Sequence, residues 1–103
     1  MSALYAVWRT DRTDGLAAGI RAATRPAHRA YMAAFSERVR MGGPLLDAAG
    51  EGCGGFMLIE AASEAEVREI VRNDPFELAG LSARIEIHPF RWQTNRPADL
   101  PPL

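Results

Sequence analysis

The chain has 103 residues, enough for one small domain with a single hydrophobic core, and 48% of them are apolar while 24% are charged. Its formal net charge of -1 gives no electrostatic signal of binding to nucleic acid or to anionic membranes. All twelve basic residues are arginines, so no lysine amine is available for Schiff-base chemistry.

Cysteine and histidine are scarce, which limits disulfide and metal chemistry. The single cysteine, Cys53, cannot form an intramolecular disulfide, and with only two histidines we expect no metal and no cofactor. The first residues lack the basic segment and apolar run of a signal peptide, and no apolar run approaches the roughly 20 residues that span a bilayer. We therefore expect a cytoplasmic protein that contacts neither membrane nor nucleic acid.

The first part of the chain predicts one strand and one broken helix. Residues 3–9 alternate with apolar side chains on both faces, which is typical of a strand covered on both sides. Residues 16–24 are alanine-rich and helical in pattern. Because Pro26 lacks an N–H and disrupts a straight helix, we expect a break there and a main helix from Pro26 to Glu37.

The middle of the chain predicts two strands and a second helix. Residues 38–46 read as a strand that two glycines and a proline interrupt, and residues 55–61 follow after a glycine-rich loop. Ser63 and Glu66 have the spacing of a capping box, which predicts that a helix begins there. Pro75 biases the residue before it away from helical geometry, so this helix should end at that point.

The end of the chain predicts a connector, a last strand and a tail. The connector covers residues 75–82 and the strand residues 83–92. Residues 93–103 contain three prolines and few apolar side chains, which predicts a disordered or partner-bound tail. We therefore expect a single domain over residues 1–92, followed by this tail.

The order of these elements, β-α-β-β-α-β, is that of an α+β ferredoxin-like sandwich. In that fold a four-stranded antiparallel sheet carries both helices on one face and leaves the other face bare. Because the strands are apolar on both sides, the bare face predicts an interface, and a two-fold homodimer is the simplest way to cover it.

His28 and Asp74 are the candidate proton-transfer pair. His28 lies on the apolar stripe of its helix, where a histidine is either a packed core residue or a general base. Asp74 falls where the inner stripe of the second helix requires an apolar residue, and at a helix C-terminus, where negative charge is disfavoured. It either forms a turn ahead of Pro75 or orients the histidine, and its two oxygens make these roles compatible.

Four motifs stand out in chain order: Arg25-Pro26-Ala27-His28 with Tyr31, Gly43-Pro44-Leu45, Asn73-Asp74-Pro75-Phe76 with Ala79-Gly80-Leu81, and Ile87 to Trp92. In this order and spacing they resemble the YciI-like, or YCII-related, family over residues 3–92. The resemblance implies a dimeric α+β barrel with a pocket between sheet and helices in each subunit. It also implies that His28 and Asp74 match the family's proposed active-site dyad. One relative in this superfamily is a dehydrochlorinase of a chlorinated hydroxyquinol-type ring.

Substrate-binding residues are expected around this dyad. Arg9 and Arg25 could each pair with an anionic or phenolate substrate or be a solvated or salt-bridged surface arginine, and we favour the surface interpretation for Arg9. The aromatic residues Trp8, Tyr31 and Phe76 either form walls of the pocket or belong to the hydrophobic core. The predicted substrate-binding set is Arg25, Trp8, Tyr31, Gly43, Pro44 and Phe76.

A His–Asp pair without a nucleophile suits proton abstraction followed by elimination or isomerisation better than acyl transfer. Cys53 is expected in an exposed loop far from the pair. We therefore predict a cofactor-free lyase or isomerase that acts on a small cyclic or aromatic substrate. The alternatives are a non-catalytic dimeric module that binds a small ligand or a partner, and a structural dimer whose tail docks another protein.

Overall fold

The structure, a computed structural model, describes residues 2–100. Its elements follow the expected order with one short helix added. They are β1 (Ala3–Asp11), α1 (Ala17–Ala33), β2 (Val39–Leu46), β3 (Gly52–Ala61), α2 (Glu64–Arg72), α3 (Pro75–Leu78) and β4 (Ser82–Phe90). The added helix, α3, lies within the segment that the sequence predicts as a connector.

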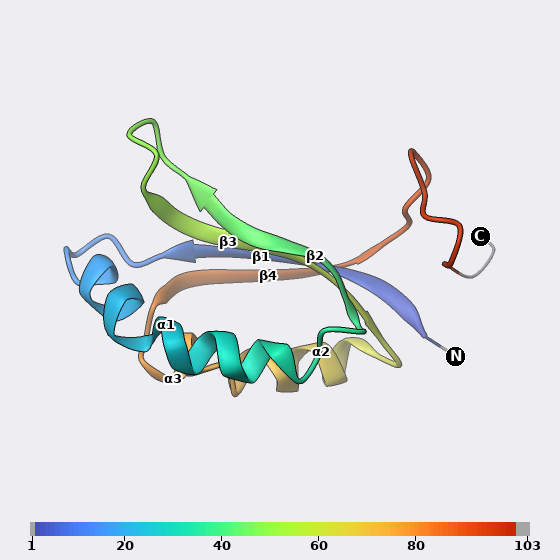
Figure 1. The fold of residues 1–103 in the computed structure, drawn as a ribbon, viewed down its shortest axis with the longest axis horizontal. Helices are drawn as coiled ribbons and strands as arrows, with labels where there is room; N and C mark the ends of the chain where they lie inside the picture. The colour runs from blue at the N-terminus through green and yellow to red at the C-terminus, as the bar shows by residue number, and fades with distance from the viewer. Residues whose placement is uncertain (1, 101–103) are drawn as a thin grey trace.

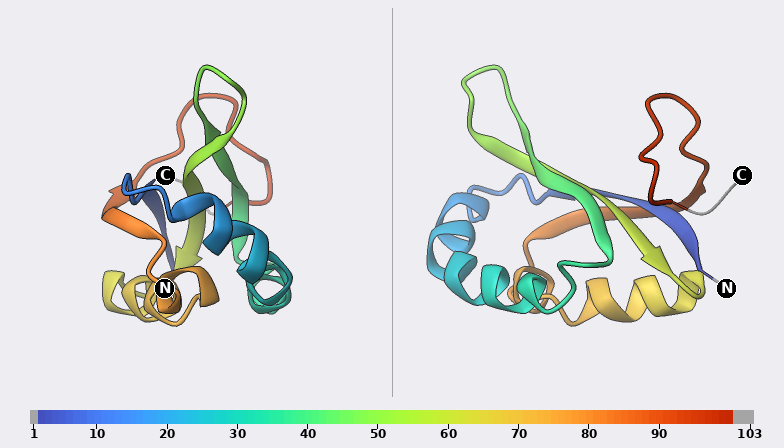
Figure 2. Two further views of the ribbon diagram at one scale, coloured as in Figure 1. Left: turned by 90° about the vertical axis from the view of Figure 1, so that its left-hand side faces the viewer. Right: turned by 45° about the vertical axis from the view of Figure 1, so that its right-hand side comes forward.

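The four strands form one antiparallel sheet in the order β2-β3-β1-β4. Within residues 2–100 the three helices cover one face of this sheet, while the opposite face carries no helix (Figure 1). The expected α+β ferredoxin-like fold is therefore confirmed. Figure 2 shows the β2–β3 hairpin rising away from the helices, at the end of the sheet where α1 begins.

Alternation along the central strands divides the sheet into two faces. Val7 of β1 and Ile59 of β3 have no exposed surface, and they pack with Met57 against Val67 and Ile70 of α2. These residues form the core between sheet and helices. Burying side chains of this size contributes about 1.5–3 kcal/mol each, so this face holds the helices in place.

The helix-free face is also apolar, and several of its large side chains are exposed. Trp8 is 47% exposed and packs edge-to-face on Phe56, with ring centroids 6.0 Å apart. Met41 of β2 is 46% exposed and Phe90 of β4 is 42% exposed. The strands are thus apolar on both sides, as the sequence indicates.

Helix α1 is continuous, in contrast to the expected break. It runs from Ala17 to Ala33 with Pro26 inside it, and therefore ends before Glu37. Proline removes one helical hydrogen bond and crowds the carbonyl four residues earlier, and a bend relieves that crowding without ending the helix. Figure 1 shows α1 changing direction between its first and second halves.

The glycine-rich loop is shorter than expected, because β3 begins at Gly52 and pairs with Leu46 at the end of β2. The Asp47 carboxylate accepts hydrogen bonds from the backbone N–H groups of Ala49 and Glu51, at 2.9 and 3.0 Å. These bonds close the turn tightly.

The segment after β4 lies on the helix-free side of the sheet (Figure 1). Asp99 accepts a hydrogen bond from Arg40 of β2 at 2.6 Å, and Leu100 is 5% exposed. As far as residue 100 this segment therefore has contacts within its own chain. The remaining part of the expected tail, residues 101–103, lies outside the described residues.

Candidate active site

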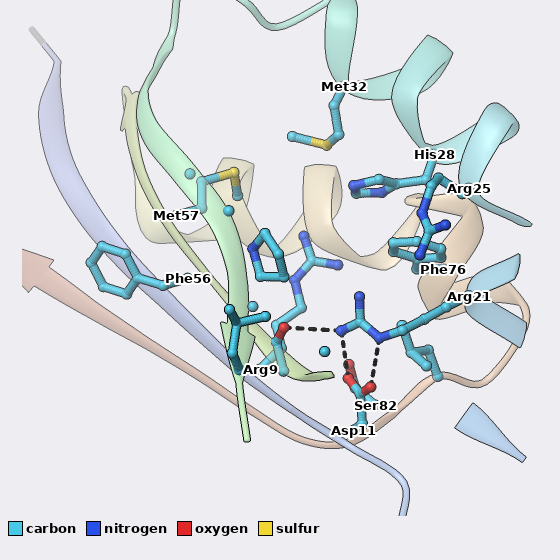
Figure 3. Close-up of a pocket in the computed structure, with 18 of the residues that line it drawn as sticks. Arg9, Asp11, Arg21, Arg25, His28, Met32, Phe56, Met57, Phe76 and Ser82 are labelled. Carbon is cyan, nitrogen blue, oxygen red and sulfur yellow. Dashed lines mark hydrogen bonds and ion pairs between the residues drawn. The ribbon is translucent and has the colours of Figure 1, made fainter. Parts of the chain in front are cut away.

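A cavity of about 910 Å³ opens between α1, the β2–β3 hairpin and the end of the sheet (Figure 3). This volume is within the usual range for small-molecule sites. Its lining includes Arg9, Asp11, Arg21, Arg25, His28, Met32, Gly43, Pro44, Phe76, Glu77 and Ser82. The cavity thus has both apolar walls and several charged groups.

His28 and Asp74 meet beside this cavity. His28 Nδ1 and Asp74 Oδ1 are 2.8 Å apart, although the two residues are 46 positions apart in the chain. The Asp74 side chain has no exposed surface, whereas the His28 side chain is 25% exposed. Because an ionised carboxylate only accepts hydrogen bonds, Nδ1 must donate. In neutral His28 the other nitrogen, Nε2, then holds the lone pair that can accept a proton.

Asp74 is positioned by the short helix that the sequence does not predict. It is the N-cap of α3, with Pro75 in the first turn, and its Oδ1 accepts a hydrogen bond from Phe76 N–H at 2.9 Å. Aspartate and proline are favoured at these two positions. The carboxylate therefore lies at the N-terminus of α3, where its charge is favourable, and it also follows the end of α2 at Arg72, as the sequence predicts.

Arg9 completes the environment of Asp74 and is not the surface residue that the sequence indicates. Its Nη1 donates to Asp74 Oδ2 at 2.7 Å and to Glu77 Oε2 at 3.0 Å, and its side chain is 12% exposed. Ser82 donates a further hydrogen bond to Glu77 at 2.7 Å. Arg9 points inward because odd-numbered residues of β1 face the helices.

The surroundings of Asp74 keep it ionised. Burial by itself raises the pKa of this carboxyl group, but the hydrogen bond with His28, the charge of Arg9 and the Phe76 N–H outweigh that effect and lower the pKa below its usual value. An ionised carboxylate fixes the tautomer of His28 and stabilises an imidazolium formed there.

Phe76 fixes the plane of the His28 ring. The two rings are stacked, with centroids 4.0 Å apart and an angle of 15° between their planes. Phe76 is 7% exposed and belongs to α3, directly after Pro75. One short helix thus supplies both the carboxylate that orients His28 and the ring on which it rests.

The other expected substrate-binding residues divide between the cavity and elsewhere. Arg25, Gly43 and Pro44 line the cavity, as Phe76 does. Tyr31 does not line it, because its hydroxyl donates to the carbonyl oxygen of Ile70 at 2.7 Å and joins α1 to α2. Trp8 points to the helix-free face, on the other side of the sheet.

Arg21 and Asp11 are among the cavity residues that are absent from the sequence prediction. Arg21 Nε donates to Asp11 Oδ2 at 2.7 Å, and this ion pair lies between α1 and the end of β1. The signal that identifies Arg21 is spacing, since Arg21, Arg25 and His28 follow the i, i+4, i+7 pattern of one helix face. Nothing in the sequence, however, shows that this face borders a cavity.

Within residues 2–100 no three His, Cys, Asp or Glu side chains gather as a metal ion requires. No helix in the same range is long and apolar enough to cross a membrane. Cys53 lies in β3 with an exposed side chain and does not line the cavity.

Comparison with known proteins supports the fold and the family. The model of the YCII-related domain matches residues 3–91. The chain belongs to the YCII-related domain family. It is 42% identical over 74 residues to the derivative of benzaldehyde biosynthesis cluster protein C of Emericella nidulans, an alignment that covers 62% of this chain and 76% of the other.

Two solved structures are also similar. One is the 5-chloro-2-hydroxyhydroquinone dehydrochlorinase of Burkholderia phenoliruptrix in complex with 2,5-dihydroxybenzoquinone, with a TM-score of 0.77, 35% identity, and coverage of 87% of this chain and 93% of that one. A NIPSNAP family protein of Agrobacterium tumefaciens has a TM-score of 0.57 at 15% identity and covers 95% of this chain and 99% of that one. The second likeness concerns the fold alone.

Proposed function

We propose that this YCII-related protein is a cofactor-free lyase or isomerase in which His28 is the general base and Asp74 orients it. The observation that carries the proposal is the 2.8 Å contact between His28 Nδ1 and a fully buried carboxylate, at the wall of a cavity of about 910 Å³. A base held in this way is ready to accept a proton at Nε2.

The chemistry requires only proton transfer and a leaving group. His28 Nε2 takes a proton from the substrate, and the electron pair left behind forms a new double bond while the leaving group departs with its own bonding pair. When the leaving group is chloride, the net change is loss of HCl. The imidazolium formed on His28 is stabilised by Asp74, whose charge the buried Arg9 maintains.

The relatives support a small ring as the substrate class. The dehydrochlorinase that is 35% identical acts on a chlorinated hydroxyhydroquinone and was solved with a dihydroxybenzoquinone. In the present chain, Phe76 and Pro44 offer apolar surface to such a ring, and Arg25 offers a positive charge.

The test measures chloride release from 5-chloro-2-hydroxyhydroquinone. We expect turnover by the wild type and a loss of about 10²–10⁴-fold in His28→Gln, because glutamine can still donate to Asp74 but is no base. His28→Ala should lose as much. The matched control is His88→Gln, which changes the other histidine, 67% exposed on β4. If both His28 variants release chloride as fast as the wild type, the proposal is wrong.

A non-catalytic role is the second candidate, and one observation favours it. The Asp74 carboxylate is fully engaged by His28, Arg9 and Phe76 N–H, so the pair also suits a rigid binding wall. In that case 2,5-dihydroxybenzoquinone raises the melting temperature while no chlorinated ring is turned over. Chloride release that depends on His28 rules this candidate out.

We also propose that the chain works as a homodimer through its helix-free face, as the sequence indicates. Trp8, Met41 and Phe90 leave a large apolar surface on this face, and such surfaces mark interfaces. Light scattering should give twice the chain mass, and Trp8→Arg should yield the monomer. The cytoplasmic location and a tail that docks another protein remain predictions.

A further inference from the structure

A second buried charged group borders the same cavity, and the proposed base does not use it. Arg21 of α1 is joined to Asp11 by two parallel hydrogen bonds, Nε to Oδ2 at 2.7 Å and Nη2 to Oδ1 at 2.8 Å. Nη2 also donates to the carbonyl oxygen of Gly54 at 2.9 Å. The side chains of Arg21 and Asp11 are 14% and 6% exposed. Such a bidentate pair is strong and fixes orientation.

These bonds leave one nitrogen of Arg21 for a ligand. A guanidinium has five N–H groups, of which Asp11 and Gly54 take the one on Nε and both on Nη2. Within residues 2–100 no hydrogen bond involves Nη1, so its two N–H groups remain. Figure 3 shows this nitrogen pointing away from Asp11, towards the side of the cavity where His28 and Phe76 lie.

The guanidinium is also fixed by its neighbours. A Cβ atom at Gly52 would lie 3.4 Å from both Cζ and Nη1, which is an ordinary contact distance, so β3 lies directly beside the guanidinium. Arg21 Cζ lies 5.6 Å from the centre of the Phe76 ring, the ring on which His28 is stacked. The base and the guanidinium therefore border the same part of the cavity, around Phe76.

We propose that Arg21 Nη1 binds the substrate oxygen that becomes negative when His28 removes a proton, so that the substrate is a small enolisable ring such as a hydroxyquinone or a polyphenol. This inference rests on the proposed function. A substrate C–H or O–H bond breaks, the proton goes to His28 Nε2, and the electron pair moves onto the ring oxygen facing Nη1. Donors that are already in place where charge develops stabilise it without reorganisation.

The free donors also select the kind of anion. A carboxylate binds arginine best through two parallel bonds, and Asp11 and Gly54 occupy the nitrogens that would provide them. The two N–H groups of one nitrogen fit a single oxygen. Asp11 and Gly54 act only through Arg21, so they are positioning residues.

The test compares three probes at pH 7 by calorimetry or absorbance titration. 2,5-Dihydroxybenzoquinone carries acidic ring oxygens, 2,5-dimethoxybenzoquinone is its uncharged counterpart, and benzoate carries a carboxylate. We expect Arg21→Gln to weaken the binding of the dihydroxy compound by about tenfold to a hundredfold, which is what one charge-assisted hydrogen bond contributes. Binding of the dimethoxy compound should stay unchanged.

A second variant guards against unfolding, because Arg21→Gln leaves Asp11 buried without its partner. Asp11→Asn/Arg21→Gln replaces the ion pair with two amides and should show the same selective loss. Arg21→Lys keeps the charge but not the fork, so it should restore only part of the affinity. Arg68→Gln on α2 is the matched control, since Arg68 is paired with Glu64 far from the cavity.

The result that overturns the inference is unchanged binding of the dihydroxy compound in both variants, or a wild type that does not distinguish it from the dimethoxy compound. A larger loss for benzoate would also overturn it, because the site would then be a carboxylate site. His28→Gln separates this inference from the proposed base, since it should abolish chloride release while the dihydroxy compound still binds. Unchanged turnover together with unchanged binding of the dihydroxy compound in Arg21→Gln would leave the base standing and remove the anion site.

Discussion

The two faces of the sheet use the same strands for different purposes. On β1, Val7 and Arg9 face the helices, whereas Ala6 and Trp8 face the other side. The helix-covered face combines the hydrophobic core with buried ion pairs beside it. The helix-free face exposes large apolar side chains to solvent. Because side chains alternate along a strand, one sequence can build a site on one face and an interface on the other.

The largest expected loss of stability comes from removing the Asp74 carboxylate. Asp74→Ala leaves Arg9 buried without a main partner, and breaking a buried ion pair costs about 3–5 kcal/mol of unfolding free energy. Urea denaturation measures this cost. Asp74→Asn, which keeps the N-cap and the size, should cost less. Equal losses in the two variants would show that the charge of Asp74 is not what stabilises this part of the fold.

A pair of truncations compares the faces directly. Ile59→Ala removes a side chain with no exposed surface and should cost about 2–5 kcal/mol. Met41→Ala, at a position that is 46% exposed on the helix-free face, should cost under about 1 kcal/mol in a monomeric sample. If Met41→Ala costs as much as Ile59→Ala at working concentration, the helix-free face is covered by a second subunit.

Acid should lower the stability of the folded protein by protonating Asp74, which lies on the helix-covered face of the sheet. Its pKa is lowered in the folded protein, so the stability it contributes is complete above its usual pKa and is lost as the pH falls through the lower, folded value. Below about pH 4 the wild type should lose up to about 1.4 kcal/mol per pH unit relative to Asp74→Asn. Urea midpoints between pH 7 and pH 2.5 measure this difference, and parallel curves would contradict it.

The smallest effect is expected where the C-terminal segment meets the helix-free face. Asp99 is paired with Arg40 at 2.6 Å, but its side chain is 71% exposed, so Asp99→Asn should leave the melting temperature almost unchanged. Thermal melts at low and high salt measure this effect. A clear drop in melting temperature, or a change in oligomeric state, would mean that the segment takes part in the interface.

The sequence predicts the fold well because periodicity and caps are local signals. Ser63 does accept a hydrogen bond from Glu66 N–H, at 3.2 Å, and the strands have the expected order. The contact between His28 and Asp74 agrees with the predicted pair, while its role in catalysis remains a proposal. The predicted break at Pro26 is wrong, because a lone proline does not reveal whether packing holds the helix on both sides of it.

The rest of the site depends on contacts between distant residues. Arg9 and Asp74 are 65 positions apart, and no local pattern reveals that the arginine is buried. Trp8 and Tyr31 have the composition of pocket walls, yet one faces the other side of the sheet and the other joins two helices. Residue type indicates which chemistry a side chain can perform, whereas strand register and helix rotation decide whether that side chain faces the cavity.

Gly54 has a consequence for redesign of this protein. A Cβ atom at this position would lie 2.3 Å from the backbone carbonyl oxygen of Arg9, so even alanine requires the two central strands to separate. Directed evolution of the β2–β3 hairpin for new substrates should therefore recover glycine at position 54 in every folded clone. Neighbouring Cys53, whose side chain is exposed, should accept many residues. Libraries that keep Gly54 fixed will contain more functional members for the same number of randomised codons.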